Sequence, residues 1–292
     1  VERFLSYMPD GAAYMARRME EGIRLITPGM FFEELGLEYI GPVNGHDVKA
    51  LIEAFSVAKG MKKPVVVHAQ TLKGKGYEKA EGHLASWHGV SPFDLQSGEA
   101  IKKSAAKSAT ALFAENLLEL ASEHENIVGV TAAMPTGTGI DALMERFPDR
   151  FWDVAIAEQH AVASMAAMAK EGFKPFIAIY STFLQRAFDQ VVHDCAIMNL
   201  NVVFAMDRAG IVGEDGETHQ GAFDVSYLNL IPNLTIFAPR CADSFRLAMC
   251  YAYAHEGPCA FRYPRGAFAL AQGEFEAREL KLGKGEILVE GG

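Results

Sequence analysis

Residues 151–169 read FWDVAIAEQHAVASMAAMA, and this stretch sets the pattern for the fold. Its first seven residues form a largely apolar run that is typical of a strand. From Ala161 onward, alanine, valine and methionine dominate, which is typical of a buried helix packed against a sheet. A strand that leads directly into a buried helix indicates a βα unit. The carboxylate of Glu158 lies at the junction, where a buried strand and a buried helix offer it little water.

The alternation of strand and helix continues along most of the chain. It predicts an α/β fold in which a mostly parallel sheet carries helices on both faces. Residues 71–103 show no sustained period and are expected to form a long functional loop and a linker. Strands are expected at 37–42, 63–71, 126–132, 151–157, 174–180, 201–207, 234–239 and 258–263, and helices at 10–21, 47–59, 108–124, 140–147, 158–169, 182–198 and 242–255.

Composition excludes several classes of protein. The 292 residues are enough for one large α/β domain or two medium ones. The 27 basic residues against 37 acidic ones give a net charge of -10, which argues against binding of nucleic acid or of an anionic membrane. No apolar run approaches the roughly 20 residues of a membrane span. The four cysteines form no C-x-x-C pair and are expected to be buried, reduced thiols.

Polar residues collect at the points where expected strands end. In a parallel sheet the carboxyl ends of the strands lie at one edge, where ligands bind. The sequence therefore predicts one site at this edge. The residues that follow strand ends are Thr71, Lys73, Lys75, Tyr77, His83, His88, Glu158, Ser181, Thr182, Phe183, Arg186, Asp207, Arg208 and Arg265, together with the glycine-rich loop GIVGEDGETHQG at 210–221, which holds His219.

The residue types in this set indicate the chemistry of the site. Guanidinium and ammonium groups bind phosphate, and imidazole carries protons near neutral pH. The cations are Lys73, Arg186, Arg208 and Arg265, and the histidines are His88 and His219.

Each of these residues also has an ordinary structural explanation. Glu158 in a first helical turn can simply be a favourable charge for the helix dipole, and loop histidines usually face solvent. The helix dipole favours the ionised form of Glu158 whereas apolar surroundings favour the neutral form. The loop 210–221 lacks the spacing of a dinucleotide site or a P-loop. The coincidence of these residues after several strands favours a functional site.

Four segments carry a specific resemblance to a known family. DVAIAEQHAV, IAIYSTFLQRAFDQVVHDCAI, DRAGIVGEDGETHQGAFD and RYPRG resemble the 1-deoxy-D-xylulose-5-phosphate synthases, thiamine-diphosphate enzymes of the transketolase superfamily. FEELGLEYIGPVNGHD and TLKGKGYEKAE resemble the later part of the first domain of that family. The resemblance implies that 1–95 is the end of a diphosphate-binding domain with an active-site loop and linker. It implies that 96–285 is a complete pyrimidine-binding domain and that 286–292 begins a third domain.

The resemblance also implies a reaction and residue roles. The family condenses pyruvate with D-glyceraldehyde 3-phosphate, with loss of CO2 through a thiamine-diphosphate enamine, in isoprenoid, thiamine and pyridoxal precursor synthesis. Glu158 would contact the aminopyrimidine ring of the cofactor, and Phe183 would stack on that ring. Lys73 and Tyr77 match family positions near thiamine diphosphate, and His88 and His219 are candidates for proton transfer. Asp215 could orient a substrate hydroxyl. The residues that would line the substrate side are Tyr180, Arg186, Arg208 and Arg265.

Further expectations concern what lies outside this sequence. The family's GDG motif and companion asparagine, which hold Mg²⁺, are expected upstream of this chain. No residue of this chain is therefore expected to bind the metal. The chain, which begins with Val1, is expected to be a fragment that binds thiamine diphosphate weakly and is inactive alone. A homodimer in the bacterial cytoplasm or plastid stroma is expected. The alternatives are a transketolase, a 2-oxoacid dehydrogenase β subunit, or a non-catalytic half of a split enzyme.

Overall fold

The computed structural model describes residues 29–83, 87–101, 107–268, 283–284 and 287. The chain divides into two compact units, 1–102 and 103–292, and each unit is described by itself. The dividing point lies close to the expected boundary at residue 95, although the expected identity of each domain stays a prediction. The helix expected at 10–21 lies outside the described residues.

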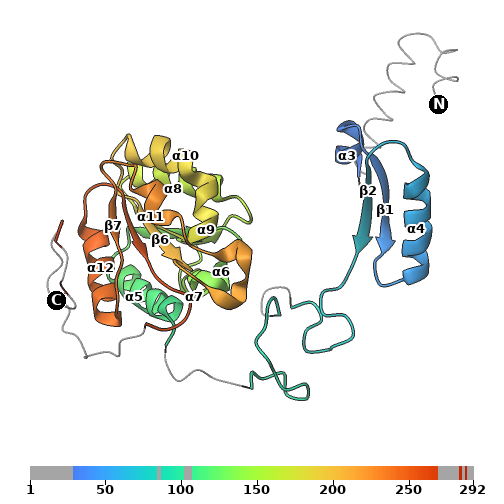
Figure 1. Cartoon of the computed structure of the whole chain (residues 1–292), viewed down its shortest axis with the longest axis horizontal. Coiled ribbons are helices and arrows are strands. Elements are labelled where there is room, and N and C mark those ends of the chain that lie inside the picture. Colours follow the sequence, from blue (N-terminus) through green and yellow to red (C-terminus); the bar gives the residue numbers. More distant parts are fainter. Residues whose placement is uncertain (1–28, 84–86, 102–106, 269–282, 285–286, 288–292) are drawn as a thin grey trace, which may run out of the picture. The chain divides into compact units, whose positions relative to one another are not determined.

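Unit 1 contains a small parallel sheet beside a long helix (Figure 1). The helix begins where the sequence predicted, because the Asp47 carboxylate accepts hydrogen bonds from the backbone N–H groups of Lys49 and Ala50. The described residues after the sheet, from Thr71 to Ile101, form turns and loops, as their lack of periodicity predicted. The elements are α3 (Met30–Glu34), β1 (Glu38–Asn44), α4 (Val48–Gly60) and β2 (Val65–Gln70).

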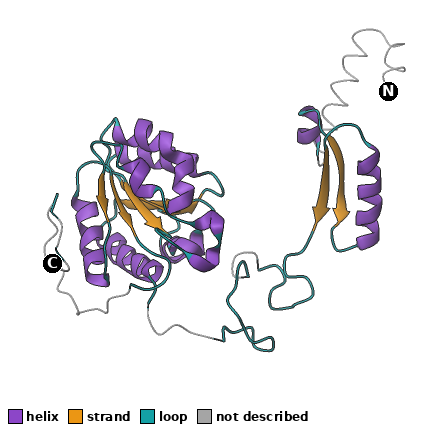
Figure 2. Ribbon diagram, viewed as in Figure 1, coloured by secondary structure: helices purple, strands orange, loops and turns teal. Residues whose placement is uncertain are grey.

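Unit 2 is built on a six-stranded parallel sheet with the strand order β4-β3-β5-β6-β8-β7 (Figure 2). Parallel strands need crossover connections, and helices provide them here. The all-parallel order confirms the predicted fold class. The strands are β3 (Ile127–Thr131), β4 (Phe151–Asp153), β5 (Lys174–Tyr180), β6 (Val203–Asp207), β7 (Thr235–Phe237) and β8 (Cys259–Arg262).

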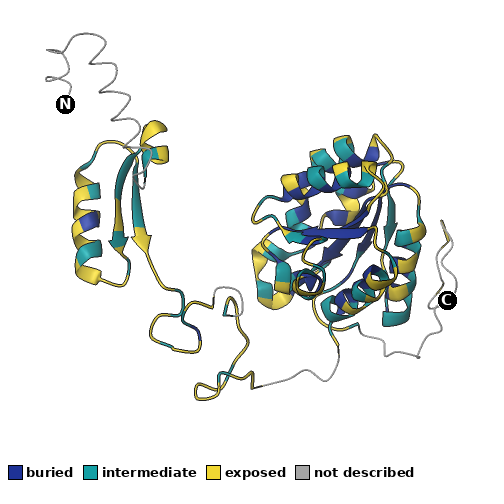
Figure 3. Cartoon of the chain, turned by 180° about the vertical axis from the view of Figure 1, so that it is seen from behind, coloured by how far each residue is buried: buried dark blue, intermediate teal, exposed yellow. Residues whose placement is uncertain are grey.

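Helices cover both faces of this sheet, and alternate residues of each strand face opposite layers. Ile177 and Ile179 of β5 pack in the cluster that includes the buried side of α8, whereas Phe176 and Ala178 pack in the cluster with α5 and α12. The inner strands β3, β5 and β6 are the most deeply buried part of unit 2 (Figure 3). The helices are α5 (Ala109–Glu123), α6 (Pro135–Thr138), α7 (Ile140–Arg146), α8 (Glu158–Lys170), α11 (Asp224–Leu228) and α12 (Ala242–Ala254), with 3-10 turns η3 (Gly213–Asp215) and η4 (Glu217–His219).

The strand expected at 151–157 is shorter in the structure, which corrects the sequence prediction. It ends at Asp153, whose Oδ1 accepts hydrogen bonds from the backbone N–H groups of Ala133 and Ala155 at 2.7 and 2.9 Å. Ala155 has a φ of 59°, a left-handed conformation that no strand continues through. The chain therefore turns before it enters α8 at Glu158.

The expectation of a single regular helix at 182–198 is wrong, because the segment changes helix type three times. The side chains of Leu184, Ala187, Val191 and Cys195 are buried and lie three or four residues apart. This spacing fits tight and wide helical turns alike, so the apolar pattern could not separate them. The segment consists of α9 (Ser181–Leu184), the 3-10 helix η1 (Gln185–Ala187), α10 (Phe188–Gln190) and the π-helix η2 (Val191–Ala196).

Two further expectations can be compared with the described residues. All four cysteines are free, and three are buried, but Cys250 is exposed, which corrects the expectation for that residue. Burial raises the pKa of the Cys195 and Cys259 thiols to about 12, so both stay protonated at neutral pH. In the described part of the chain, no helix combines the length and apolar character that a membrane span requires.

Candidate functional site

The order of the strands creates a switch point between β3 and β5. From β3 the chain passes outward to β4 and then returns to β5 on the other side of β3. In parallel sheets ligands bind outside the carboxyl ends of the strands at such a point. The site residues predicted in unit 2 all lie at or after the carboxyl ends of β4, β5, β6 or β8.

Glu158 is the first residue of α8, and its side chain is only 4% exposed. A buried carboxylate needs a polar partner, and here the partner is Arg186, whose Nη1 lies 2.5 Å from Glu158 Oε1. Arg186 is half exposed, and its guanidinium also lies 4.9 Å from the centre of the Phe183 ring. The structure therefore brings together three residues that the sequence predicted separately.

Three rings gather beside this ion pair. Tyr180 and Phe183 stack with centroids 5.9 Å apart, and the His219 ring lies edge-on to Phe183 at 5.2 Å. Tyr180 and Phe183 come from the end of β5, whereas His219 comes from η4 in the glycine-rich loop. The three rings are only partly buried. They form a surface on which a flat heteroaromatic ring could stack.

Arg208 is held by groups from four elements. Its Nε lies 3.3 Å from Asp215 Oδ2, and its Nη1 lies 3.0 Å from Asp207 Oδ1. The same Nη1 donates a short hydrogen bond to the backbone carbonyl of Gly137 in α6. The guanidinium carbon lies 4.1 Å from the centre of the Tyr180 ring. Arg208 is therefore fixed in position before any ligand arrives.

Asp215 bridges two arginines. While its Oδ2 faces Arg208, its Oδ1 lies 2.8 Å from Nε of Arg265, whose Nη1 also lies 3.3 Å from Glu214 Oε2. The sequence-based role of Asp215, to orient a substrate hydroxyl, stays a prediction. Both oxygens of Asp215 are engaged, so a phosphate or a hydroxyl that binds here exchanges with an existing ion pair.

Asp207, the last residue of β6, is fully buried beside Arg208. Burial raises the pKa of this carboxyl from 3.8 to about 6, against the opposing effects of Arg208 and of the Thr110 hydroxyl. The sequence placed Asp207 at a strand end but assigned it no role. Thr110 and Gly137 gave no sequence signal, because only the folding of α5 and α6 against β6 brings them to Arg208.

The remaining predicted residues lie in unit 1. Lys73 Nζ lies 2.9 Å from His88 Nδ1, so these two predicted residues are neighbours. Tyr77 packs its ring against Trp87 and Phe93, with centroids 5.2 and 5.7 Å away, and its hydroxyl donates to a backbone carbonyl in the same loop. Tyr77 therefore has a structural role in this loop, and its contact with a cofactor stays a prediction.

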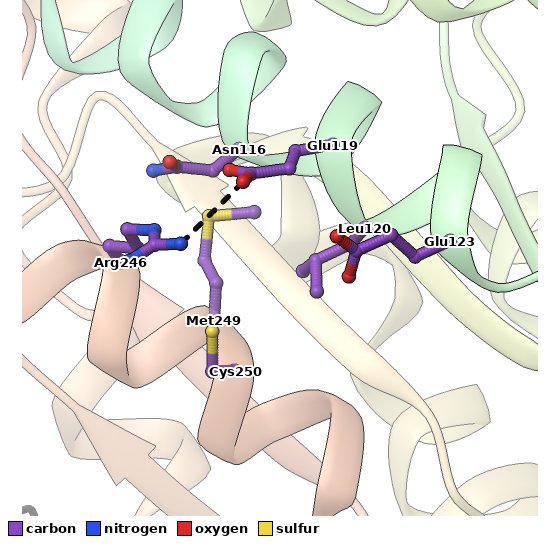
Figure 4. A pocket seen from close by; sticks show the side chains of 7 residues that line it. All are labelled: Asn116, Glu119, Leu120, Glu123, Arg246, Met249 and Cys250. Carbon is purple, nitrogen blue, oxygen red and sulfur yellow. Dashed lines mark ion pairs between the residues drawn. The ribbon is translucent and has the colours of Figure 1, made fainter.

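A pocket elsewhere in unit 2 is separate from this site (Figure 4). The Glu119 and Arg246 side chains form an ion pair across it at 3.5 Å, and Cys250 lies at its α12 side. None of the predicted site residues lines it. Its lining comes from α5 and α12 and consists of Asn116, Glu119, Leu120, Glu123, Arg246, Met249 and Cys250.

Comparison with known proteins identifies the domain that carries the site. Residues 105–269, more than half of the chain, match the family described as transketolase, pyrimidine binding domain. The chain belongs to the transketolase pyrimidine-binding domain family. Glu158, the three neighbouring rings and the two arginines joined by Asp215 all lie within this pyrimidine-binding domain. Residues 1–71 match a second family, described as 1-deoxy-D-xylulose-5-phosphate synthase.

Individual relatives confirm the resemblance seen in the sequence. The 1-deoxy-D-xylulose-5-phosphate synthase of Campylobacter fetus subsp. fetus is 68% identical over 291 residues, which are 100% of this chain and 48% of that relative. The protein of the same name from Campylobacter hominis is 69% identical over 290 residues, covering 99% and 48%. The chain spans about half the length of these curated relatives.

A solved structure supports the fold of the pyrimidine-binding domain. A split-gene transketolase, described as an inactive β4 tetramer, is 27% identical with a TM-score of 0.55 over 64% of this chain and 60% of that chain. Within the described residues, no group of three or more His, Cys, Asp or Glu side chains could hold a metal ion. The expectation that the Mg²⁺ ligands lie outside this sequence stays a prediction.

Proposed function

We propose that this chain supplies the pyrimidine and substrate side of the active site in an enzyme that condenses pyruvate with D-glyceraldehyde 3-phosphate with loss of CO2. The observation that carries this proposal is the identity with 1-deoxy-D-xylulose-5-phosphate synthases along the whole chain. The product would be 1-deoxy-D-xylulose 5-phosphate, a precursor of isoprenoids, thiamine and pyridoxal. The arrangement at the carboxyl ends of β4, β5, β6 and β8 supports it.

The proposed cofactor is thiamine diphosphate, which when bound supplies the carbanion chemistry that side chains cannot perform. Arg186 occupies Oε1 of Glu158, and in the described part of the chain no hydrogen bond reaches Oε2. The free oxygen can share a proton with a ring nitrogen. Phe183, with the Tyr180 and His219 rings beside it, offers a partly exposed face for the same ring. The donor set therefore fits an aminopyrimidine.

The proposed substrates match the cationic part of the site. Arg208 and Arg265, held side by side by Asp215, would bind the phosphate of the triose. His219 is within ring contact of Phe183, which places a proton carrier beside the stacking surface. His88, with Lys73 as its neighbour in unit 1, is the second candidate for proton transfer. Mg²⁺ would hold the cofactor diphosphate through residues outside this chain.

The assembly and location are also proposals. A homodimer in the bacterial cytoplasm is favoured over the plastid stroma, because the relatives named above are bacterial. The likeness to a chain of a split-gene transketolase supports one alternative, a subunit that needs a separate partner chain. A partner that co-purifies in a one-to-one ratio would favour this alternative.

A chimera tests the proposed reaction. The matched 291 residues of the Campylobacter fetus relative are replaced by this chain, and CO2 release from pyruvate is measured with D-glyceraldehyde 3-phosphate as the acceptor. We expect turnover, and we expect Glu158→Gln to lower kcat by about 10²–10⁴-fold, since a proton-sharing carboxyl is removed. Glu171→Gln, at the exposed far end of α8, is the matched control and should leave kcat unchanged.

Two outcomes would contradict the proposal. One is a folded chimera that transfers ketol groups between sugar phosphates but does not consume pyruvate. The other is a Glu158→Gln chimera with the kcat of the parent. Calorimetric titration of the isolated chain with thiamine diphosphate and Mg²⁺ is a separate check, in which we expect weak binding or none because the diphosphate side is supplied elsewhere.

A further inference from the structure

We propose that Asp207 is a positioning residue that sets the orientation of Arg208, so that one edge of its guanidinium faces the substrate. This inference rests on the proposed function, in which Arg208 binds the triose phosphate. Asp207 itself touches neither substrate nor cofactor in this account. It acts through Arg208, and its own carboxylate accepts a hydrogen bond from Thr110 of α5.

The backbone at Arg208 shows that its position is constrained. Arg208 directly follows β6 and has a φ of 57°, a left-handed conformation that is unfavourable for a residue with a side chain. Strained backbone persists where surrounding groups hold it and is concentrated at functional sites. Asp207 provides one such hold, because its Oδ1 accepts the backbone N–H of Arg208 at 2.7 Å.

The same carboxylate holds the Arg208 side chain. Oδ1 of Asp207 lies 3.0 Å from Nη1, so one oxygen contacts both the backbone and the guanidinium of the next residue. The other oxygen, Oδ2, accepts the hydroxyl hydrogen of Thr110 at 2.7 Å. Both oxygens are occupied and the residue is fully buried, so Asp207 cannot turn toward a ligand.

These contacts leave a defined donor edge on Arg208. Nε faces Asp215, Nη1 faces Asp207 and the Gly137 carbonyl, and one face of the guanidinium covers Tyr180. Among the described residues, the hydrogen bonds of the Arg208 guanidinium come from Nε and Nη1, and none comes from Nη2. Nη2 can therefore donate to a phosphate oxygen without first giving up a hydrogen bond, whereas Nε is available only after Asp215 moves.

Keeping the Asp207 carboxylate ionised in the protein interior is unfavourable, and its hydrogen bond to the Arg208 backbone alone does not require the charge. Burial disfavours its ionised form, and an asparagine of the same shape would accept the backbone hydrogen bond without this cost. A carboxylate differs from that amide in pairing with the guanidinium charge. The retained charge therefore points to the orientation of Arg208 as its use.

Nuclear magnetic resonance of the whole 292-residue chain tests this role. With 15N-labelled arginine, Arg208 is assigned by its loss in Arg208→Lys, and the probe ligand is inorganic phosphate. In the parent chain we expect separate Nη1 and Nη2 signals for Arg208, because the guanidinium is held. In Asp207→Asn we expect these signals to merge and phosphate affinity at Arg208 to fall about tenfold.

Thr110 provides a milder pair of variants that keeps the test decisive even where Asp207→Asn does not fold. Thr110→Val removes the hydroxyl at nearly constant shape and should partly merge the Arg208 signals, whereas Thr110→Ser keeps the hydroxyl and should match the parent. A folded Asp207→Asn chain, or Thr110→Val chain, with unchanged Arg208 signals would overturn the proposal.

The two proposals can fail separately. If Asp207→Asn releases the guanidinium but phosphate does not shift the Arg208 signals of the parent chain, then the positioning by Asp207 is supported. The proposed phosphate contact of Arg208 is then wrong. If phosphate shifts the Arg208 signals equally in the parent and in Asp207→Asn, then the phosphate contact of Arg208 is supported. The positioning role of Asp207 is then wrong.

Discussion

Glu158 and Asp207 are two buried carboxylates near the same sheet edge, but their oxygens are used differently. Glu158 shares only Oε1 with Arg186, a side chain that is itself half exposed. Asp207 has both oxygens engaged, by Thr110 and by Arg208. Since, within the described ranges, Glu158 keeps one oxygen without a hydrogen bond while Asp207 is fully buried with both oxygens engaged, Glu158 is suited to chemistry on a bound ring and Asp207 to holding another residue.

The Glu158–Arg186 pair gives a prediction for stability. Arg186→Gln leaves a buried carboxylate without its cation, so we expect the free energy of unfolding at pH 7 to fall by about 1–2 kcal/mol, less than for a fully buried pair because Arg186 is half exposed. Adding Glu158→Gln should recover most of this loss. Urea unfolding of the two single variants and the double variant measures the coupling, and purely additive effects would show that the pair is not formed in solution.

Asp207 gives a prediction for pH dependence. Its pKa is raised from 3.8 in the unfolded chain to about 6, so the folded state binds the extra proton, and the stability from this group is lost as pH rises from about 4 to above 6. The pKa difference between 3.8 and about 6 corresponds to roughly 3 kcal/mol of folding stability. We expect the unfolding free energy of the parent chain, relative to Asp207→Asn, to fall by about this amount between pH 4 and pH 7.

Other titrating groups do not obscure this measurement. The charged or titratable neighbours of Asp207 are Arg208, Tyr180 and Tyr263, and none of them changes charge between pH 4 and pH 7. Groups that the substitution does not touch contribute equally to both curves, so they cancel in the difference. Parallel stability curves for the two chains would show that Asp207 is ionised throughout this range.

At the scale of elements, the short connection from β4 to α8 places Glu158. The strand stops at Asp153, and the turn through Ala155 sets Glu158 at the first position of the helix. A long strand of seven residues would carry the chain further before the helix began. The position of the carboxylate therefore depends on a turn rather than on either regular element.

This turn gives a prediction for a small stabilisation. Ala155 is exposed and has a φ of 59°, so Ala155→Gly should relieve strain and raise the unfolding free energy by up to about 1 kcal/mol. Ala167→Gly, at an exposed position inside α8, is the matched control and should lower it by about 1 kcal/mol. Thermal unfolding distinguishes the two, and equal losses in both variants would contradict the left-handed turn.

At the scale of the whole molecule, the described parts of the two units differ in how much core they contain. Both hydrophobic clusters and all six strands of the larger sheet lie in unit 2. The described part of unit 1 has a two-stranded sheet, and its helix α4 exposes Val48, Ile52 and Phe55, whose spacing places them on one side of the helix. Two strands alone rarely form a stable sheet in water.

This difference predicts that the units differ in independent stability. Residues 103–292 expressed alone should unfold in one cooperative transition, whereas residues 1–102 expressed alone should show no cooperative transition by circular dichroism. Leu117→Ala, in the core of unit 2, should lower the unfolding free energy of the 103–292 piece by about 2–5 kcal/mol. A piece 103–292 that fails to fold would show that unit 2 depends on the preceding residues.

Much of the fold followed from local patterns in the sequence. Continuous apolar runs such as 174–180 indicated strands covered on both faces, and Asp47 marked a helix start, because burial and capping act over a few neighbouring residues. The change of helix type within 181–196 could not be predicted, since the buried positions keep the same spacing in each type. The clustering of the unit 2 site residues at one sheet edge followed from the parallel topology. The expectation of a single edge was wrong for Lys73, Tyr77 and His88, which follow β2 of a separate two-stranded sheet in unit 1.

The partners of those residues were decided only by the tertiary structure. The sequence by itself determined the α/β class, the strand ends that carry charge and the family to which the site residues belong. It did not determine that Arg186 pairs with Glu158, that Asp215 joins two arginines or that Thr110 reaches Asp207 across 97 positions of the chain. Such pairs depend on the order of strands in the sheet and on side-chain directions, which local sequence patterns do not encode.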